Sequence, residues 1–245
     1  MKIMSLNIGG YGFEAKSSEE WEIRKINLVN AVKIEKPDVL FLEEVVDNQK
    51  YQLADGLNQA QQLNKELNYE HSIYDVVEQI FGYGGRALDY QVFDSLLCLT
   101  NLDIIEHRLF RLKKVETDKH YRAVQIIKVI FLGKEVLFYH IHYSNKNDWS
   151  KLHLEETKNY FINKAENPII VGDLNISNPA IIKEILGNNF QYSYDFKKYS
   201  SFPSKDEVLD YSIIPNGHYI FNEIKCGYDG CSDHRALITK INFIL

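Results

Sequence analysis

The chain has few cysteines, and they form no pattern that signals a disulfide framework. Its 245 residues contain three, Cys98, Cys226 and Cys231, which is an odd and sparse set. The simplest interpretation is free thiols in a reducing compartment. Cys226 and Cys231 flank a Gly-Tyr-Asp-Gly loop, so a small disulfide between them is the alternative. Two thiols alone make a poor zinc site, so zinc is not expected there.

The chain also lacks a long apolar run and an excess of positive charge. Apolar stretches such as Val136 to Tyr139 are far too short to span a bilayer, so stable membrane insertion is not expected. Residues 1–2 lead directly into a predicted strand, without a secretory segment, which predicts a cytoplasmic protein. An exported protein trimmed of its signal would start in the same way. The net charge of −6 argues against extensive, sequence-independent binding of nucleic acid. Basic loops and a bound cation can still supply positive charge locally.

The pattern of apolar residues predicts a mixed α/β chain with many strands. Because the motifs described below extend from one end to the other, we interpret residues 1–245 as one domain. A Gly133-Lys134 turn is expected between two of the strands. A Gln-rich helix is expected over residues 55–66 and should be exposed. The predicted strands cover residues 3–6, 39–42, 95–100, 122–132, 136–142, 168–171, 209–214, 219–224 and 236–243, and the predicted helices cover residues 18–34, 55–66, 154–165 and 181–186.

Short polar motifs stand at the ends of these apolar runs. Oxygen-bearing side chains and two histidines that converge on one rim of a sheet would suit a hard metal ion and a phosphate. Each motif is weak alone, because two or three residues recur by chance. The six motifs are Leu6-Asn7, Leu42-Glu43-Glu44, Ile141-His142, Gly172-Asp173-Leu174-Asn175, Leu209-Asp210-Tyr211 and Ser232-Asp233-His234.

Taken in order, these motifs resemble those of the endonuclease/exonuclease/phosphatase superfamily, which has the deoxyribonuclease-I-like fold. The resemblance runs from Asn7 to His234, nearly the whole chain. It implies a four-layer α/β/β/α sandwich, in which two packed mixed β-sheets are flanked by helices. It also implies a hydrolase of phosphoester bonds that depends on Mg²⁺, with Mn²⁺ as a substitute. One departure is Glu43, which stands where the family usually has glutamine.

The resemblance also assigns roles to individual residues. Metal binding falls to Glu44, to the amide oxygen of Asn7 and to Asp233 or its water shell. Asp173 would orient or deprotonate the attacking water, and Asn175 would hold the phosphate or the nucleophile. Asp210 would fix the tautomer and charge of His234, which would bind the phosphate from one side while His142 donates from the other. Arg122 and Asn145 are the expected substrate contacts, and His140 is expected to support the site from behind.

The substrate remains open at this point. Nucleic acid is the expected partner, so a monomeric endo- or exonuclease on DNA or RNA is the first hypothesis. The alternative enzyme is a phosphatase or phosphodiesterase for a small phosphorylated metabolite or lipid headgroup, and a non-catalytic binding module is a third. The densest basic run, Arg108, Arg111, Lys113 and Lys114, is interpreted as a solvated loop in preference to a nucleic-acid patch.

Overall fold

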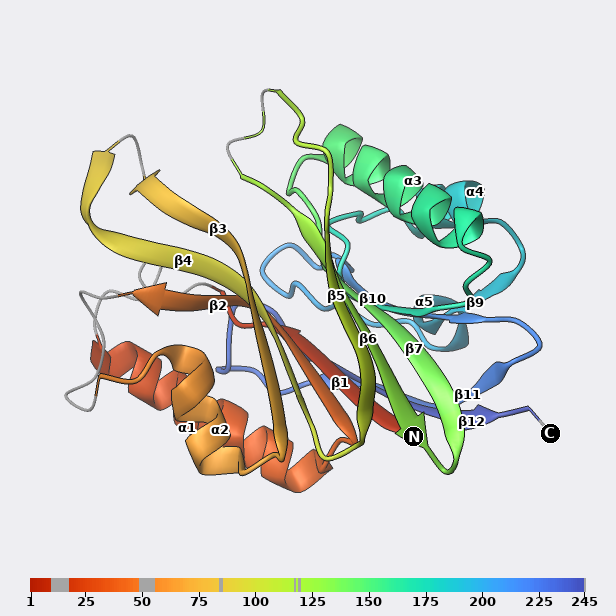
Figure 1. The fold of residues 1–245 in the computed structure, drawn as a ribbon, viewed down its shortest axis with the longest axis horizontal. Helices are drawn as coiled ribbons and strands as arrows, with labels where there is room; N and C mark the ends of the chain where they lie inside the picture. The colour runs from red at the N-terminus through yellow and green to blue at the C-terminus, as the bar shows by residue number, and fades with distance from the viewer. Residues whose placement is uncertain (10–17, 49–55, 84–85, 117, 119, 245) are drawn as a thin grey trace.

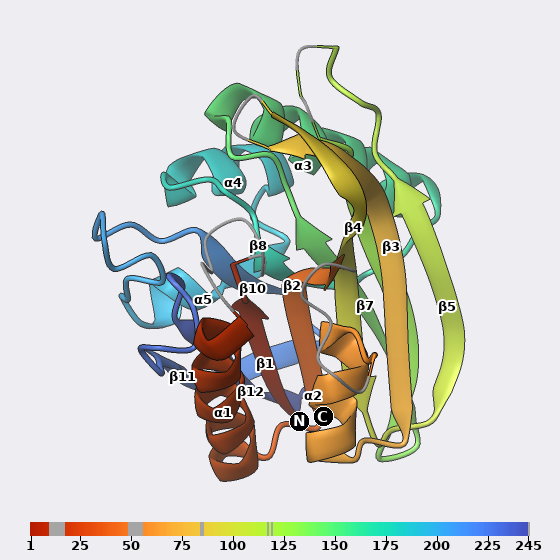
Figure 2. The same cartoon turned by 90° about the vertical axis from the view of Figure 1, so that its left-hand side faces the viewer.

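Two six-stranded sheets pack face to face, with helices on both outer sides (Figures 1 and 2). The computed structural model describes residues 1–9, 18–48, 56–83, 86–116, 118 and 120–244. This arrangement confirms the predicted four-layer sandwich. Such layering lets each sheet bury one face against the other sheet and one against helices.

Each sheet mixes parallel and antiparallel pairs. In the first sheet the order is β11-β12-β1-β2-β4-β3, and in the second it is β5-β6-β7-β8-β10-β9. The first contains β1 (Lys2–Asn7), β2 (Val39–Asn48), β3 (His71–Tyr83), β4 (Arg86–Thr100), β11 (Tyr219–Gly227) and β12 (Ala236–Phe243). The second contains β5 (Ile104–Arg111), β6 (Ala123–Phe131), β7 (Lys134–His142), β8 (Ile169–Asp173), β9 (Phe190–Tyr192) and β10 (Asp210–Pro215).

The helices cover the outer faces. α1 (Ser18–Glu35) and α2 (Gln59–Leu67) lie on the first sheet, whereas α3 (Asn147–Asn163) and α4 (Pro179–Leu186) lie on the second (Figure 1). A short α5 (Ser193–Phe196) follows β9. Among the helices described, none is long and apolar enough to cross a membrane. Separate apolar clusters fill the three interfaces, and the middle one, around Phe41, Phe138 and Ile214, lies between the sheets.

Strand direction brings the predicted motifs to one rim. β1 runs parallel to β2, and β7 runs parallel to β8, so the carboxyl ends lie together within each pair. A contact of 3.1 Å between Asn7 and Asp173 shows that both pairs end at the same rim. β10 and β12 are antiparallel to β8 and β1, so their first residues lie at that same rim. The six motifs therefore converge because of sheet topology, as expected from the sequence.

Several element predictions need correction. The turn between β6 and β7 is Leu132-Gly133 rather than Gly133-Lys134, because both residues take positive φ (52° and 73°), as a type I′ hairpin requires. β2 does not end at its glutamates but continues to Asn48 after a register shift between Leu42 and Val45. The 55–66 helix is not simply exposed, since Gln59, Ala60, Gln62 and Leu63 are buried.

The hairpin of β3 and β4 and the strand β5 were largely missed. Arg108 and Arg111 consequently lie on β5 and not in a solvated loop. Arg108 forms ion pairs with Glu106 (2.6 Å) and Glu166 (2.8 Å). Arg111 donates to the carbonyl of Val77. The three cysteines are free thiols, so the alternative disulfide is wrong.

Candidate active site

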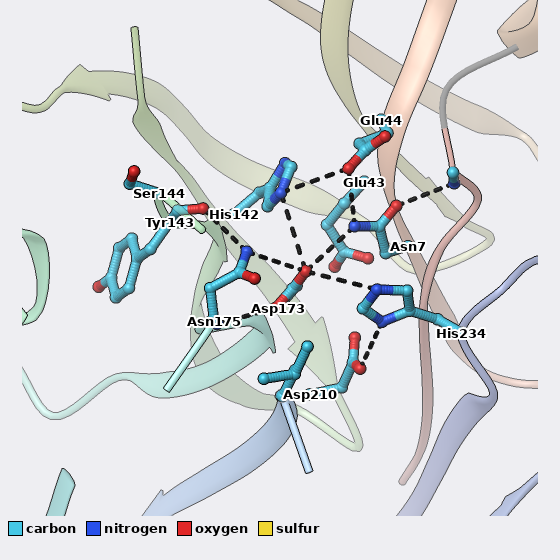
Figure 3. Close-up of polar contacts among 12 residues, drawn as sticks. Asn7, Glu43, Glu44, His142, Tyr143, Ser144, Asp173, Asn175, Asp210 and His234 are labelled. Atoms are coloured by element: carbon cyan, nitrogen blue, oxygen red, sulfur yellow. Dashed lines mark hydrogen bonds and ion pairs between the residues drawn. The ribbon is translucent and has the colours of Figure 1, made fainter. Parts of the chain in front are cut away.

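The predicted site residues line one cavity at the rim between the sheets. The cavity has a volume of about 750 Å³. Nine of the ten predicted residues border it: Asn7, Glu44, Arg122, His142, Asn145, Asp173, Asn175, Asp233 and His234. The tenth, Asp210, is fully buried and supports His234. Figure 3 shows how the central side chains point toward one another from both sheets.

Asp210 and His234 form the expected pair. The Asp210 carboxylate accepts a hydrogen bond from Nδ1 of His234 over 2.8 Å, and Nε2 faces Asp173 at 4.0 Å. Burial opposes protonation of this ring, but the Asp210 charge and hydrogen bond outweigh it and raise the pKa of His234 to about 10. His234 is therefore an imidazolium at neutral pH, able to donate to a phosphate oxygen.

Asp173 lies at the centre of the cluster. Its Oδ2 accepts hydrogen bonds from the side-chain amides of Asn7 and Asn175, each at 3.1 Å. Its Oδ1 accepts from the backbone N–H of Asn175 at 2.8 Å, which makes a tight Asx turn with Asn175 at φ 51°. Burial and then the Asp210 charge raise the pKa of Asp173 to about 7. A carboxylate with this pKa suits a general base near neutral pH.

His142 faces Asp173 from the other side. Its Nε2 lies 3.6 Å from Glu44 and 3.8 Å from Asp173. Burial, followed by the neighbouring Arg122 charge, holds the pKa of His142 well below its usual range. A neutral ring can still donate from one nitrogen, and the nearby carboxylates favour Nε2–H. Asp173 therefore lies between a neutral ring, His142, and a positively charged ring, His234.

The two glutamates of β2 point to different places. The backbone of Glu44 is in the left-handed region (φ 54°), which turns its side chain to the rim, where that side chain is 31% exposed. Glu43 points between the sheets and is fully buried. Burial, and then the Asp210 charge, raise the pKa of Glu43 well above its usual range. Of the two, Glu44 is the one placed to bind an ion.

Asn7 is oriented differently from the expectation. Its amide oxygen accepts the N–H of Gly9 at 2.9 Å. Its amide nitrogen bridges Glu44 (3.0 Å) and Asp173 (3.1 Å). The structure therefore directs the nitrogen of Asn7, and not the expected oxygen, at the two carboxylates.

The donor set fits a hard cation. Glu44 and Asp173 come from different sheets, yet one amide nitrogen reaches both, so two carboxylates converge at the rim. Oxygen ligands of this type suit Mg²⁺ or Mn²⁺. Asp233 is exposed beside Gly9 and accepts from Ser232 at 2.9 Å. Asp173, Asp210 and His234 also place one possible ligand atom each within 4.8 Å of one another. His234 is hydrogen-bonded to Asp210, and its Nε2 lies 4.0 Å from Asp173.

Arg122 is a second buried cation of the site, in addition to His234. It is only 8% exposed, and no described carboxylate forms an ion pair with it. Its Nη1 lies 3.3 Å from Nδ1 of His142. A guanidinium that forms no ion pair among the described residues and lies at the edge of a cavity is suited to a phosphate oxygen.

Sequence reasoning missed the segment that ties the catalytic residues together. The hydroxyl of Ser201 accepts from the backbone N–H groups of Leu209 (3.0 Å) and Asp210 (3.1 Å), and its carbonyl accepts from Arg235. The next residue, Phe202, places its ring 4.9 Å from the ring of His234. No periodicity marks this loop, so nothing in the sequence singled it out. By contrast, buried Ser5 stands two residues before Asn7, and strand alternation would have indicated it.

Comparison with known proteins agrees with the fold and with the family that the sequence resembles. The profile of the Endonuclease/Exonuclease/phosphatase family matches residues 4–234. The comparison with curated proteins gives no match. Among solved structures, an endonuclease/exonuclease/phosphatase from Beutenbergia cavernae superimposes with a TM-score of 0.80 at 17% identity, covering 99% of this chain and 71% of that one.

Two further structures share the fold. The human nocturnin catalytic domain, solved with bound sulfate, gives a TM-score of 0.70 at 17% identity and covers 100% of this chain and 94% of that one. A mannosyl-6-phosphatase from Bacteroides thetaiotaomicron gives 0.68 at 14% identity, covering 99% and 100%. Identities this low establish the fold and leave the substrate undefined.

Proposed function

Because this chain belongs to the endonuclease/exonuclease/phosphatase family, we propose that it is a divalent-metal-dependent hydrolase of phosphodiester bonds. The observation that supports this most is the placement of Asp173 between a protonated His234 and a neutral His142, with Glu44 beside them. A base, two donors and an ion-binding carboxylate are the groups that attack of water on phosphorus requires.

Each side chain has a defined task in this proposal. Glu44 would hold a Mg²⁺ or Mn²⁺ ion, with Asp233 acting on its water shell. When bound, the ion would polarise the phosphate and offset its charge. Asp173 accepts the proton of the attacking water, and Asn175 fixes the Asp173 carboxylate through two hydrogen bonds. His234, His142 and Arg122 donate to the phosphate oxygens as negative charge develops.

Nucleic acid is the first substrate class we propose. Two lysines, Lys146 and Lys205, and two aromatic residues, Trp149 and Phe202, line the cavity. Lysines meet phosphates, and aromatic rings stack on bases. Asn145 borders the same side of the cavity and remains a proposed contact.

A small phosphorylated metabolite or lipid headgroup is the second candidate. The cavity falls within the size range of small-molecule sites. Three acidic residues, Asp148, Glu207 and Asp233, share its rim with the lysines, so the rim is mixed in charge and not a basic groove. The chain as a whole carries −6.

A substrate panel tests the proposal. The protein would be assayed with Mg²⁺ or Mn²⁺ on plasmid, abasic duplex, single-stranded DNA, RNA, 5′-tyrosyl DNA, sphingomyelin and inositol phosphates. An Asp173→Asn protein, purified in parallel, reports contaminating activity. Hydrolysis by the natural protein alone supports a phosphoesterase, and absence of any hydrolysis above the variant would reject it.

A further inference from the structure

A layer of buried polar side chains separates the active site from the apolar centre between the sheets. It consists of inward-facing residues that neighbour site residues on the same strands. Ser5 precedes Asn7 by two positions, His140 precedes His142 by two, and Ser212 follows Asp210 by two. All three are fully buried, as is Glu43 on β2. Because buried polar groups are costly without partners, their hydrogen bonds indicate what the layer does.

Glu43 makes polar contacts with residues of both sheets. Its Oε1 accepts a hydrogen bond from the hydroxyl of Ser5 at 2.9 Å, on neighbouring β1. The same oxygen lies 2.8 Å from Nε2 of His140, which comes from β7 of the opposite sheet. The carboxyl of Glu43 is therefore a link between the two sheets, directly beneath the rim.

His140 is held in one orientation from outside. The side-chain amide of Gln125 donates to Asp75 at 2.8 Å, so its oxygen is the atom that faces the ring. That oxygen lies 2.9 Å from Nδ1 of His140, which must carry a proton to bond to it. The other ring nitrogen, Nε2, is then directed at Glu43. The ring of Phe41 packs against His140 at 4.8 Å and limits tilting.

Glu43 also meets the strand that carries Asp173. Gly172 has φ +127°, and a Cβ there would lie 2.1 Å from the carbonyl oxygen of Ile141 and 2.9 Å from Oε1 of Glu43. Only glycine fits, and the Glu43 carboxyl occupies the side of the strand where a side chain would stand. The residue after this contact is Asp173, so the position of Glu43 bears on the position of the base.

We propose that Glu43 and His140 act as one positioning unit for Asp173. Together they form the buried support against which the Gly172–Asp173 backbone rests. The effect on turnover rests on the function proposed above. Since misplacement of a catalytic group by about 1 Å can cost about 100-fold in rate, loss of this support lowers kcat more than it raises KM.

Four variants test the unit on a small chromogenic phosphodiester with Mg²⁺. Glu43→Ala and His140→Ala are each expected to lower kcat by about 10- to 100-fold, with KM changed by less than about threefold. The double variant should be no slower than the slower single variant, because both changes remove the same support. Glu43→Gln should restore kcat to within about fivefold, because its amide has the same length and can bond to Ser5 and His140. Additive losses in the double variant, or unchanged kcat in Glu43→Ala, would overturn the proposal.

Thr239→Val is the matched control. Thr239 is buried at the inner end of the same polar layer and contacts only Ser212, at 3.4 Å, among the described polar side chains. This variant should lower the melting temperature slightly and leave kcat unchanged. All rates are taken well below the melting temperature of each variant, so that an unfolded fraction does not count as lost turnover.

A measurement without substrate separates this proposal from the function. In ¹⁵N-labelled protein, the amide signals of Gly172 and Asp173 should shift in Glu43→Ala and in His140→Ala, return near their natural positions in Glu43→Gln, and stay in place in Thr239→Val. If the natural protein hydrolyses no phosphoester, the proposed function fails while these signals still decide the positioning unit. Unshifted Asp173 signals in both alanine variants would reject the unit even in an active enzyme.

Discussion

Asp210 holds His234 by a single hydrogen bond of 2.8 Å between Oδ2 and Nδ1, and this bond sets both the orientation and the charge of the ring. The opposite nitrogen, Nε2, is thereby presented toward Asp173 and the cavity. A carboxylate behind an imidazole is a common way to fix a catalytic tautomer. Because Asp210 does not itself line the cavity, its contribution can be measured separately from direct substrate contact.

Asp210→Asn should lower kcat by about 100-fold or more while KM changes little. The asparagine keeps the shape of the side chain but removes the charge that stabilises the imidazolium. Steady-state kinetics on a substrate hydrolysed by the natural protein provide the measurement. A change confined to KM would mean that Asp210 acts through binding and not through His234.

The charge of His234 predicts a specific pH dependence. Its pKa is raised to about 10, so the imidazolium persists across neutral pH and is lost only as the pH approaches that value. Asp173, with a pKa raised to about 7, becomes a base as the pH rises through neutrality. Activity should therefore increase through pH 7 and fall near pH 10. In Asp210→Asn both limbs should move to lower pH, because Asp210 raises both pKa values.

NMR titration of the ring provides an independent check in metal-free protein. The ¹⁵N signals of His234 should stay those of an imidazolium at pH 8, whereas those of His142, whose pKa is depressed, should stay neutral at pH 6. A neutral His234 at pH 7 would contradict the assignment. His142 serves as the internal comparison because both rings border the same cavity.

The site residues could be predicted because each motif ends an apolar run, which is a local pattern, and because the order of the motifs resembles that of a known family. Asn7, His142 and Asp173 each close an apolar run, and parallel pairing then brings them to one rim. The orientation of a side chain, by contrast, depends on tertiary contacts and could not be predicted. That Asn7 offers its nitrogen depends on the N–H of Gly9, a contact invisible in the residue order.

The missed elements have a physical cause. β3 changes register between Val76 and Glu78 and again between Ile80 and Gly82, so bulges interrupt the two-residue period on which strand prediction depends. α2 looked exposed because it is rich in glutamine. In the structure Gln59 accepts from the backbone of Val46 at 2.9 Å, and Gln62 accepts from Trp21 at 2.7 Å. Both side-chain oxygens are therefore satisfied by tertiary contacts, which lowers the cost of burying these amides.

Metal removal should abolish activity. Exhaustive treatment with EDTA is expected to stop hydrolysis, and Mg²⁺ or Mn²⁺ should restore it. Glu44→Gln should raise the Mg²⁺ concentration needed for half-maximal activity by at least about tenfold, because a neutral amide replaces a carboxylate ligand. Glu184→Gln, an exposed change on α4, is the matched control and should behave as the natural protein. Full activity after chelation would reject the metal proposal.

Arg122 should contribute to binding of the phosphate. Arg122→Met removes a buried cation that has no ion pair among the described residues, so KM should rise by about 10- to 100-fold, equivalent to about 1.4–2.7 kcal/mol. Arg122→Lys keeps the charge but loses the planar guanidinium, so its KM should lie between those of the natural protein and Arg122→Met. Inhibition by inorganic phosphate gives a second measure, since it should weaken in parallel. Equal phosphate inhibition in all three proteins would remove Arg122 from the phosphate site.

The nucleic-acid hypothesis now rests on few basic residues. Arg108 and Arg111 are engaged within the fold, and Lys151 pairs with Asp148 at 3.6 Å. This leaves Lys113, Lys114, Lys146 and Lys205 as contacts that could meet phosphates. Four such contacts give a slope of log affinity against log salt no steeper than about −4 on duplex DNA. Lys113→Ala/Lys114→Ala should weaken DNA binding and flatten that slope by about 2 without affecting a small chromogenic phosphodiester. Lys33→Ala/Lys65→Ala, with exposed lysines on α1 and α2, removes the same charge elsewhere and should leave binding unchanged. If DNA and RNA remain uncut with either metal while a small phosphoester is hydrolysed, the nuclease hypothesis fails and the small-substrate alternative replaces it.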